Sequence, residues 1–233
     1  MHTIKASVLV VTLALAFFAV ASADIVTVDG TINTGLGQEW ENPFSVNQDG
    51  ADLGAGHEAY DINWNYQLWD PGSGHAFFAF DVVGANLQAD NTGNHVDILI
   101  DADKNAATGD DPYTGTGGFD YWMTYDLSSG TTYGTNYALM EYNSGTSSWD
   151  LVANPTYFEV ARGTKAIEWG VAGSDLGYPD TFYWGGYFDN GVLASEDWCP
   201  NDWDQEGRAP EPATLALFAL GLGGLYLKRR RSS

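Results

Sequence analysis

Short apolar and aromatic segments alternate along the chain with clusters of Gly, Asn, Asp and Pro. An apolar period of two residues is typical of strands, and such clusters mark turns. Between the two chain ends no ten-residue stretch keeps a helical period, and the best helical fragments are Ala85–Ala89 and Ser174–Leu176. We therefore expect strands near Ile25–Val28, Ala59–Tyr66, Ala76–Val82, His95–Ile100, Phe119–Tyr125, Tyr137–Tyr142, Thr156–Val160, Lys165–Val171 and Phe182–Phe188.

Strands of this number and spacing predict an all-β domain, a β-sandwich of the jelly-roll type. We expect the domain to cover residues 24–203 and a polar linker to cover residues 204–209. About 180 residues are enough to bury a sizeable core. The aromatic fraction of 14% excludes an acidic disordered chain, which would be poor in aromatic residues.

The first 23 residues have the pattern of a secretory signal peptide with a short signal helix. Lys5 precedes an apolar run, Ser7–Val20, and the small residues Ala21 and Ala23 frame a cleavage site. The alternative is an N-terminal membrane anchor. The apolar run is short for a hydrocarbon core of about 30 Å, which favours cleavage after Ala23.

The C-terminal residues 210–233 have three parts: Pro210-Glu211-Pro212, an apolar helix predicted at 213–227, and the basic block Lys228–Arg231. Basic residues at the end of an apolar helix stay on the cytoplasmic side. The three parts in this order resemble the PEP-CTERM sorting signal of Gram-negative bacteria. The resemblance implies transient anchoring in the inner membrane, recognition by an exosortase-type protease, and export to the cell surface or an extracellular matrix.

The formal charge of the whole chain is −22, and it is concentrated between the two ends. Residues 24–209 contain 30 of the 31 acidic side chains but only 4 of the 9 basic ones, which gives a formal charge of −26. Binding to nucleic acid or to an anionic lipid surface needs clustered Lys and Arg. The charge therefore excludes these partners and favours a cation or a neutral partner.

An acidic loop directly after one predicted strand is the sharpest chemical feature. Asp101, Asp103 and Asn105 occupy alternate positions, and Asp110 or Asp111 follows a Thr-Gly turn. Oxygen ligands in this spacing can converge on Ca²⁺, which takes 6–8 of them at about 2.3–2.6 Å. The loop lacks the Gly and Glu of an EF-hand. We expect a calcium site, which Mg²⁺ would fit less well because it retains its waters.

The alternative for this loop is a polar turn without a cation. Asp and Asn side chains readily accept hydrogen bonds from their own backbone. In that case Lys104 would neutralise part of the charge.

Aromatic residues suggest a second kind of site, since the chain has 9 Trp and 13 Tyr. Aromatic faces with a few polar neighbours can bind a sugar, but Trp also fills sandwich cores. We expect most Trp residues in the core and take Trp64 and Trp184 as the candidate carbohydrate-binding residues, because polar or aromatic strand residues flank both.

Catalytic motifs are weak, and we expect no enzyme. Glu141, Glu159 and Glu168 permit a glycosidase hypothesis with paired carboxylates, but carboxylates are common in this chain. The histidines lack His-Glu-x-x-His spacing, and there is no Gly-x-Ser-x-Gly elbow. One cysteine, Cys199, excludes an intrachain disulfide and a cysteine-based zinc site.

A series of short motifs spans roughly residues 25–192. It opens with Asp29-Gly30, continues with a strand ending at Phe80-Asp81-Val82 and the acid-flanked strand Val96–Asp101, and closes with a late strand containing Glu168. This order resembles family 9 carbohydrate-binding modules and their DOMON-like relatives. The resemblance implies a non-catalytic sandwich that binds polysaccharide. No Pro follows Glu168 directly, so no sugar-binding residue is transferred. A structural matrix or adhesion protein without a sugar site is the alternative.

Overall fold

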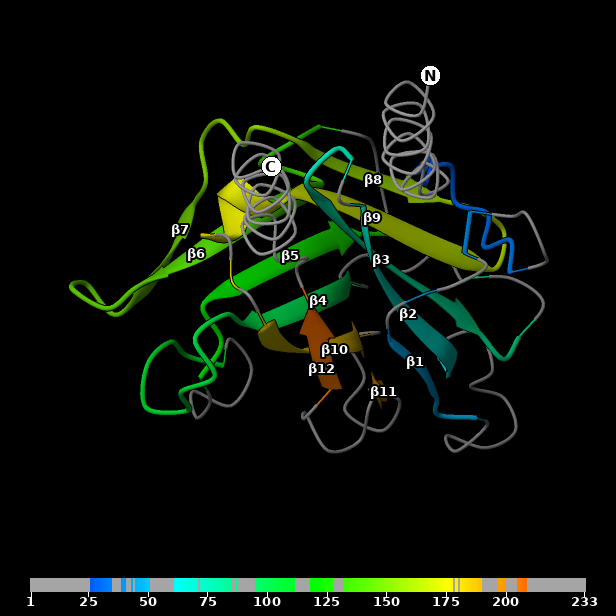
Figure 1. The fold of residues 1–233 in the computed structure, drawn as a ribbon, viewed down its shortest axis with the longest axis horizontal. Coiled ribbons are helices and arrows are strands. Elements are labelled where there is room, and N and C mark those ends of the chain that lie inside the picture. Colours follow the sequence, from blue (N-terminus) through cyan, green and yellow to red (C-terminus); the bar gives the residue numbers. More distant parts are fainter. Residues whose placement is uncertain are drawn as a thin grey trace, which may run out of the picture.

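The structure is a computed structural model of the chain. It describes residues 26–34, 39–40, 43, 45–50, 61–70, 72–84, 87, 95–111, 118–127, 132–177, 179, 181–189, 197–199 and 205–208. These residues form two antiparallel sheets and one short 3₁₀ helix, η1 (Gly173–Leu176), so the all-β prediction is confirmed. Figure 1 shows the two sheets as layers of one sandwich. The expected signal peptide and C-terminal helix lie outside the described residues.

The first sheet, called sheet A, has the strand order β1-β2-β3-β9-β8. Its strands are β1 (Ser45–Gln48), β2 (Ile62–Asp70), β3 (His75–Val82), β9 (Ala166–Ala172) and β8 (Phe158–Arg162). Every neighbouring pair is antiparallel. The sheet therefore joins strands β1, β2 and β3, which end at Val82, to strands β8 and β9, which begin only at Phe158.

The second sheet, called sheet B, has the order β11-β10-β4-β5-β6-β7, and β12 also pairs with β10. Its strands are β4 (His95–Asp101), β5 (Tyr121–Asp126), β6 (Tyr137–Asn143), β7 (Ser148–Leu151), β10 (Thr181–Asp189), β11 (Asp197–Cys199) and β12 (Gln205–Arg208). Strands β11 and β12 pair with different halves of β10.

The core between the sheets is built by alternate residues of the inner strands. Phe78 and Phe80 of β3 point into it, whereas Phe77 between them points to the outer face of sheet A. Rings from the two sheets meet there: Phe78 lies 5.2 Å from Trp184, measured between ring centroids, and Phe80 lies 6.4 Å from Phe188. Such large rings dominate the apolar area removed from water.

A pair of side-chain bonds ties strand β11 of sheet B to strand β2 of sheet A. The amide of Asn65 donates to the carbonyl oxygen of Cys199 at 2.8 Å, and the carboxylate of Asp197 accepts the backbone N–H of Ile62. The thiol of Cys199 is fully buried in the core, where it acts as a small apolar group. These bonds hold the two layers together at this edge.

The outer face of sheet A is covered by the N-terminal segment, residues 26–34 with 39–40. Its Val26 and Trp40 pack on Tyr66, Leu68 and Phe77 of β2 and β3 in a second apolar cluster. Gly30 has φ of +82°, and a Cβ at this position would lie 2.3 Å from the backbone nitrogen of Gly163. Only glycine fits such a close approach.

The carboxylate of Glu168 holds this segment in place. Glu168 lies on β9 and is 0% exposed. One of its oxygens accepts the backbone N–H groups of Asp29, Gly30 and Thr31 at 2.6–3.1 Å. The other accepts the indole N–H of Trp40 at 2.7 Å. Burial raises the pKa of Glu168 to about 7, although the N–H donors of Trp40, Gly30 and Asp29 act in the opposite direction.

Most of the predicted strands are present, with shifted ends. The strand expected at Ala59–Tyr66 is β2, which runs on to Asp70, and the one expected at Thr156–Val160 is β8. Residues 26–28 are irregular rather than a strand. Part of the expected linker pairs with β10 as strand β12, because the half of β10 beyond β11 offers free backbone groups. The short fragment expected at Ser174–Leu176 lies within η1.

In the part of the chain that the structure describes, no helix has the length and apolar character needed to cross a bilayer.

Replacing Glu168 with Gln tests the role of its carboxylate. The side-chain NH₂ of Gln would face N–H groups that a carboxylate oxygen now accepts, and these N–H groups would lose their acceptor. We therefore expect the free energy of unfolding to fall by about 3 kcal/mol. Urea denaturation of the full-length chain measures it. Glu141→Gln, at an exposed position, is the control and should change stability by less than about 0.5 kcal/mol. Equal stabilities of the two variants would show that Glu168 does not hold the segment.

Candidate functional site

Three carboxylates converge where β4 ends and β5 begins. Asp101 is the last residue of β4, Asp103 lies in the loop that follows, and Asp120 directly precedes β5. One oxygen from each lies within 4.8 Å of the others. Asp101 is only 7% exposed, whereas Asp103 is exposed. The group therefore has a buried side and a side open to solvent.

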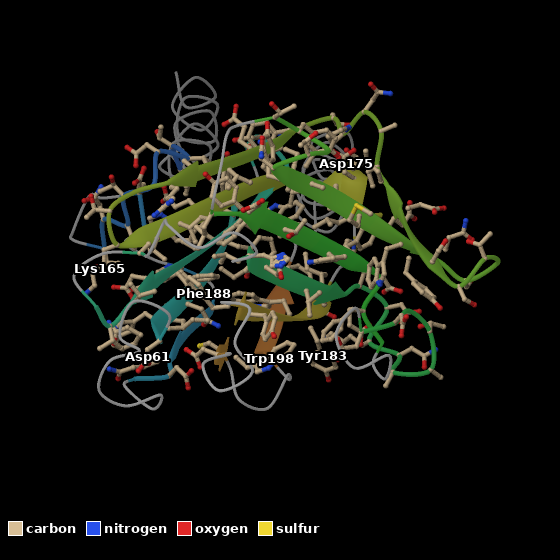
Figure 2. All side chains as sticks on the ribbon, turned by 180° about the vertical axis from the view of Figure 1, so that it is seen from behind. Asp61, Lys165, Asp175, Tyr183, Phe188 and Trp198 are labelled. Carbon is tan, nitrogen blue, oxygen red and sulfur yellow. The ribbon has the colours of Figure 1, made fainter. Side chains whose placement is uncertain are left out.

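The loop after β4 is folded tightly around these carboxylates. Lys104 has φ of 56°, a left-handed conformation that is uncommon for a residue other than glycine. The backbone N–H groups of Lys104 and Asn105 both donate to Asp101. The ammonium of Lys104 lies 4.7 Å from the ring centroid of Tyr183 on β10. Figure 2 shows Tyr183 beside this loop.

Close backbone packing brings Asp120 into the group. Gly109 has φ of +72°, and a Cβ there would lie 2.2 Å from the carbonyl oxygen of Phe119. The loop can therefore lie directly on the residues before β5. The carboxylate of Asp120 accepts the backbone N–H groups of Ala102 and Asp103 at 2.8 and 3.2 Å.

The carboxylates that lie together differ in part from the calcium ligands expected from the sequence. Asp101 and Asp103 lie together as expected, but their third carboxylate among the described residues is Asp120, where we expected Asp110 or Asp111. Asp110 instead donates its backbone N–H to the carbonyl of Phe119, and Asp111 is buried. Asp120 could have been found from the sequence, since consecutive antiparallel strands place the residue before the second strand opposite the end of the first.

The hydrogen bonds expected for a polar turn without a cation are also present. The Asp103 carboxylate accepts the N–H of Asn105 at 2.9 Å and the hydroxyl of Thr108 at 2.9 and 3.0 Å. The side-chain oxygen of Asn105 accepts the N–H of Ala107. These bonds order the loop, but a carboxylate has about four lone-pair sites, so acceptor capacity remains for a cation.

The electrostatics of the group disfavour three bare carboxylates. Burial raises the pKa of Asp101 to about 6, and the charges of Asp120 and Asp103 act in the same direction. Burial and the charge of Asp103 also raise the pKa of Asp120. A divalent cation among the three oxygens would remove this penalty, and hard oxygen donors are the ligands that Ca²⁺ prefers.

The two candidate carbohydrate-binding residues lie in different surroundings. Trp184 is 0% exposed and packs edge-on against Phe78 in the core, so its prediction as a sugar-stacking residue is wrong. The strand Phe182–Phe188 is aromatic on both faces, and its inward face holds Trp184. Trp64 is partly buried on the outer face of sheet A, where its ring stacks on Tyr66 at a centroid distance of 6.5 Å.

The carboxylates of the glycosidase hypothesis do not share an open site in the described residues. Glu168 is buried under the N-terminal segment. Glu159 on β8 is exposed and accepts the hydroxyl of Tyr157 at 3.0 Å. Glu141 is exposed on β6, in the other sheet.

The sorting residues Pro210, Glu211 and Pro212 and the cleavage residues Ala21 and Ala23 lie outside the described residues. Comparison with known proteins bears on the former: residues 208–231 match the PEP-CTERM protein-sorting motif. This match indicates an exported protein that is sorted by an exosortase. No curated protein and no solved structure matches the chain, so the relation to carbohydrate-binding modules has no support from known proteins.

The raised pKa values of Asp101 and Glu168 should make the melting temperature of the full-length chain depend on pH when a chelator is present. The pKa of Asp101 is about 6 in the folded chain against an ordinary value of 3.8. Its stabilising contribution is therefore complete below about pH 4 and is lost as the pH rises through about 6. Glu168 acts with the same sign between 4.5 and about 7. We expect the melting temperature to fall between pH 4 and 7.

Asp101→Asn is the matched variant for this measurement, because it cannot ionise. Its melting temperature should fall less steeply over the same range. A melting temperature of the wild-type chain that rises from pH 4 to 7 in chelator would contradict the prediction.

Proposed function

We propose that this chain is an exported, non-catalytic protein of the bacterial cell surface or extracellular matrix, whose β-sandwich is stabilised by Ca²⁺ and binds polysaccharide. The match of residues 208–231 to the sorting motif is the observation that carries export and exosortase sorting. Calcium, polysaccharide and a matrix location in a Gram-negative bacterium are the further parts of the proposal.

Calcium is supported by the three carboxylates within 4.8 Å, one from the end of β4, one from the loop and one from the residue directly before β5. A cation there would cross-link the ends of two paired strands. Ca²⁺ tolerates irregular shells of 6–8 oxygens, and water can supply the ligands on the exposed side. Mg²⁺ would demand a near-octahedral shell, for which three clustered carboxylates are a poor match.

A non-catalytic role is supported by the use of Glu168. Its two oxygens accept four N–H groups, from Asp29, Gly30, Thr31 and Trp40, and the side chain is fully buried. A general acid or base must reach the proton that it transfers. The Glu168 carboxylate serves the fold instead.

A neutral polysaccharide fits the charge and the aromatic content. The domain between the chain ends carries a formal charge of −26, which repels anionic partners. Trp64 remains partly exposed and is retained as a candidate residue for stacking on sugar. The buried Trp184 leaves this role to other side chains.

Calcium should raise the melting temperature of the full-length chain at pH 7.5. Binding to the folded state alone stabilises by about 2.7 kcal/mol when the free concentration is 100 times Kd. Asp103→Asn should abolish the rise, although its side-chain oxygen can still accept the N–H of Asn105 and the hydroxyl of Thr108. The matched control is Asp150→Asn, at an exposed position of β7 outside the cluster. If calcium changes neither the wild type nor the control, the loop is a polar turn.

Processing of the tail is tested by the mature C-terminus. In a host with an exosortase, intact mass should show a chain that lacks residues 213–233, because Pro210 and Pro212 interrupt a regular helix and leave an extended segment for the protease. In a host without the protease the tail should remain. A secreted chain that still ends at Ser233 in the exosortase-positive host would refute sorting by cleavage.

A further inference from the structure

Strand β12 ends almost at the sorting motif. It spans Gln205–Arg208, the match to the motif begins at residue 208, and only Ala209 separates the strand from Pro210. Because a chain extends by at most about 3.6 Å per residue, the Cα atom of Pro210 can lie no more than about 7 Å from that of Arg208. While β12 is paired, the motif is therefore held close to the edge of sheet B.

The pairing of β12 with the first half of β10 fixes this position. The four pairs run in antiparallel register from Gln205 opposite Trp184 to Arg208 opposite Thr181. Figure 1 shows β12, in orange, beside β10. The end of β12 that leads into the motif is thus bound to the very start of β10. A protease that approaches the motif meets a folded sheet within a few residues of it.

The sequence of β12 gives its pairing little support. Gln205, Glu206, Gly207 and Arg208 include no apolar residue, so the strand adds no apolar side chain to the core. Glycine inside a strand weakens it, because glycine loses much backbone freedom and has no side chain to pack. Segments with few apolar contacts open locally at a lower cost than core strands do. We therefore expect β12 to separate from β10 while the sandwich stays folded.

Strand β10 keeps its other contacts when β12 separates. Phe182 and Trp184 face the core, where their ring centroids lie 6.0 and 5.2 Å from that of Phe78. Strand β4 pairs with the opposite edge of β10. Strand β11 stays tied to β2 through the bonds of Asn65 and Asp197. The opening is therefore local to β12.

Separation greatly increases the reach of the motif. Without the β12 pairing, the last paired residue before the motif is Cys199 at the end of β11, eleven positions before Pro210. That length of chain spans about 36 Å when extended. Extended peptides are commonly bound through their backbone N–H and C=O groups. In the paired arrangement β10 takes such groups of β12, and proteolysis of a locally folded segment proceeds through its open form.

From these observations we propose that exosortase binds this chain only after β12 has separated from β10, and that residues 205–209 belong to the segment that it binds. The paired arrangement withholds the motif, and the open arrangement presents it. This inference rests on the proposed sorting by cleavage. It adds that the folded domain controls when the motif becomes accessible to the protease.

A pair of cysteines can lock β12 in place. Thr181→Cys with Arg208→Cys joins the two residues of one cross-strand pair. Opposite residues of antiparallel strands have Cα atoms about 4.5–5.5 Å apart, which suits a disulfide. The bond forms in an oxidising compartment after export, and Cys199 is buried away from it. In an exosortase-positive host, intact mass over time should show cleavage of the locked chain at least about tenfold slower than that of the wild type.

The matched control carries the same two cysteines and an added spacer. An insertion of about eight Gly and Ser residues between Ala209 and Pro210 adds about 28 Å of reach while β12 stays locked. Its backbone can take the place of residues 205–209 in the protease. We therefore expect cleavage of this variant to return to the rate of the wild type.

The remaining outcomes separate the inference from the proposed function. Cleavage of the locked chain at the wild-type rate would overturn the inference and leave sorting by cleavage intact. Loss of cleavage with and without the spacer would do the same, because the loss would then come from the substitutions. Absence of cleavage in the wild type would overturn both.

Hydrogen exchange of the full-length chain in detergent measures the opening without the protease. The slowest amide of β12 should exchange at least about tenfold faster than the slowest amide of β4, because β12 opens locally. Equal protection of the two strands would contradict the inference.

Discussion

The buried carboxylate of Glu168 is the constraint on which the outer face of sheet A depends. A carboxylate removed from water costs several kcal/mol unless hydrogen bonds replace its hydration. Here all of those bonds come from one segment, through three successive backbone N–H groups and the indole of Trp40. If the segment left, Glu168 would lose its partners and Tyr66 and Phe77 would lose their cover. The hydrogen bonds to Glu168 and the apolar cluster therefore both hold the segment on sheet A.

This arrangement connects opposite ends of the domain. The bonds of Glu168 join residues that are 128 to 139 positions apart in the chain. The N-terminal segment is made before β9, so its bonds to Glu168 can form only after β9 has also been made. Long-range pairing of this kind forms late, because loop closure must precede the contacts. The short motifs around Asp29-Gly30 and Glu168, which suggested a known module, are thus two halves of one structural contact.

The sequence predicted those elements whose pattern directly reflects burial. Strands β3, β4 and β9 have apolar runs that only a covered sheet explains, whereas β1, β7, β11 and β12 are short and mixed and were missed. The strand around Trp184 is aromatic on both faces, so its pattern could not say which ring points inward. For the acidic loop, composition identified Asp101 and Asp103, but Asp120 required the register between β4 and β5. The face of the sheet to which a side chain points, and the residue that it lies opposite, depend on how the strands pair in the folded protein.

The buried carboxylate of Glu168 and the cluster of Asp101, Asp103 and Asp120 are stabilised in different ways. Glu168 receives four N–H donors from the chain itself, and burial still raises its pKa to about 7. Asp101 and Asp120 each receive two backbone N–H groups, but they also lie within 4.8 Å of each other and of Asp103. These donors do not offset burial, which is the largest cause of the raised pKa of Asp101 and of Asp120, and the charges of neighbouring carboxylates act in the same direction. A proton or an external cation would remove this penalty, so the cluster can respond to both the pH and the cations of the medium that the chain meets after export. The contact at Glu168 responds to pH through the raised pKa of that carboxyl, and its hydrogen-bond donors all come from the chain.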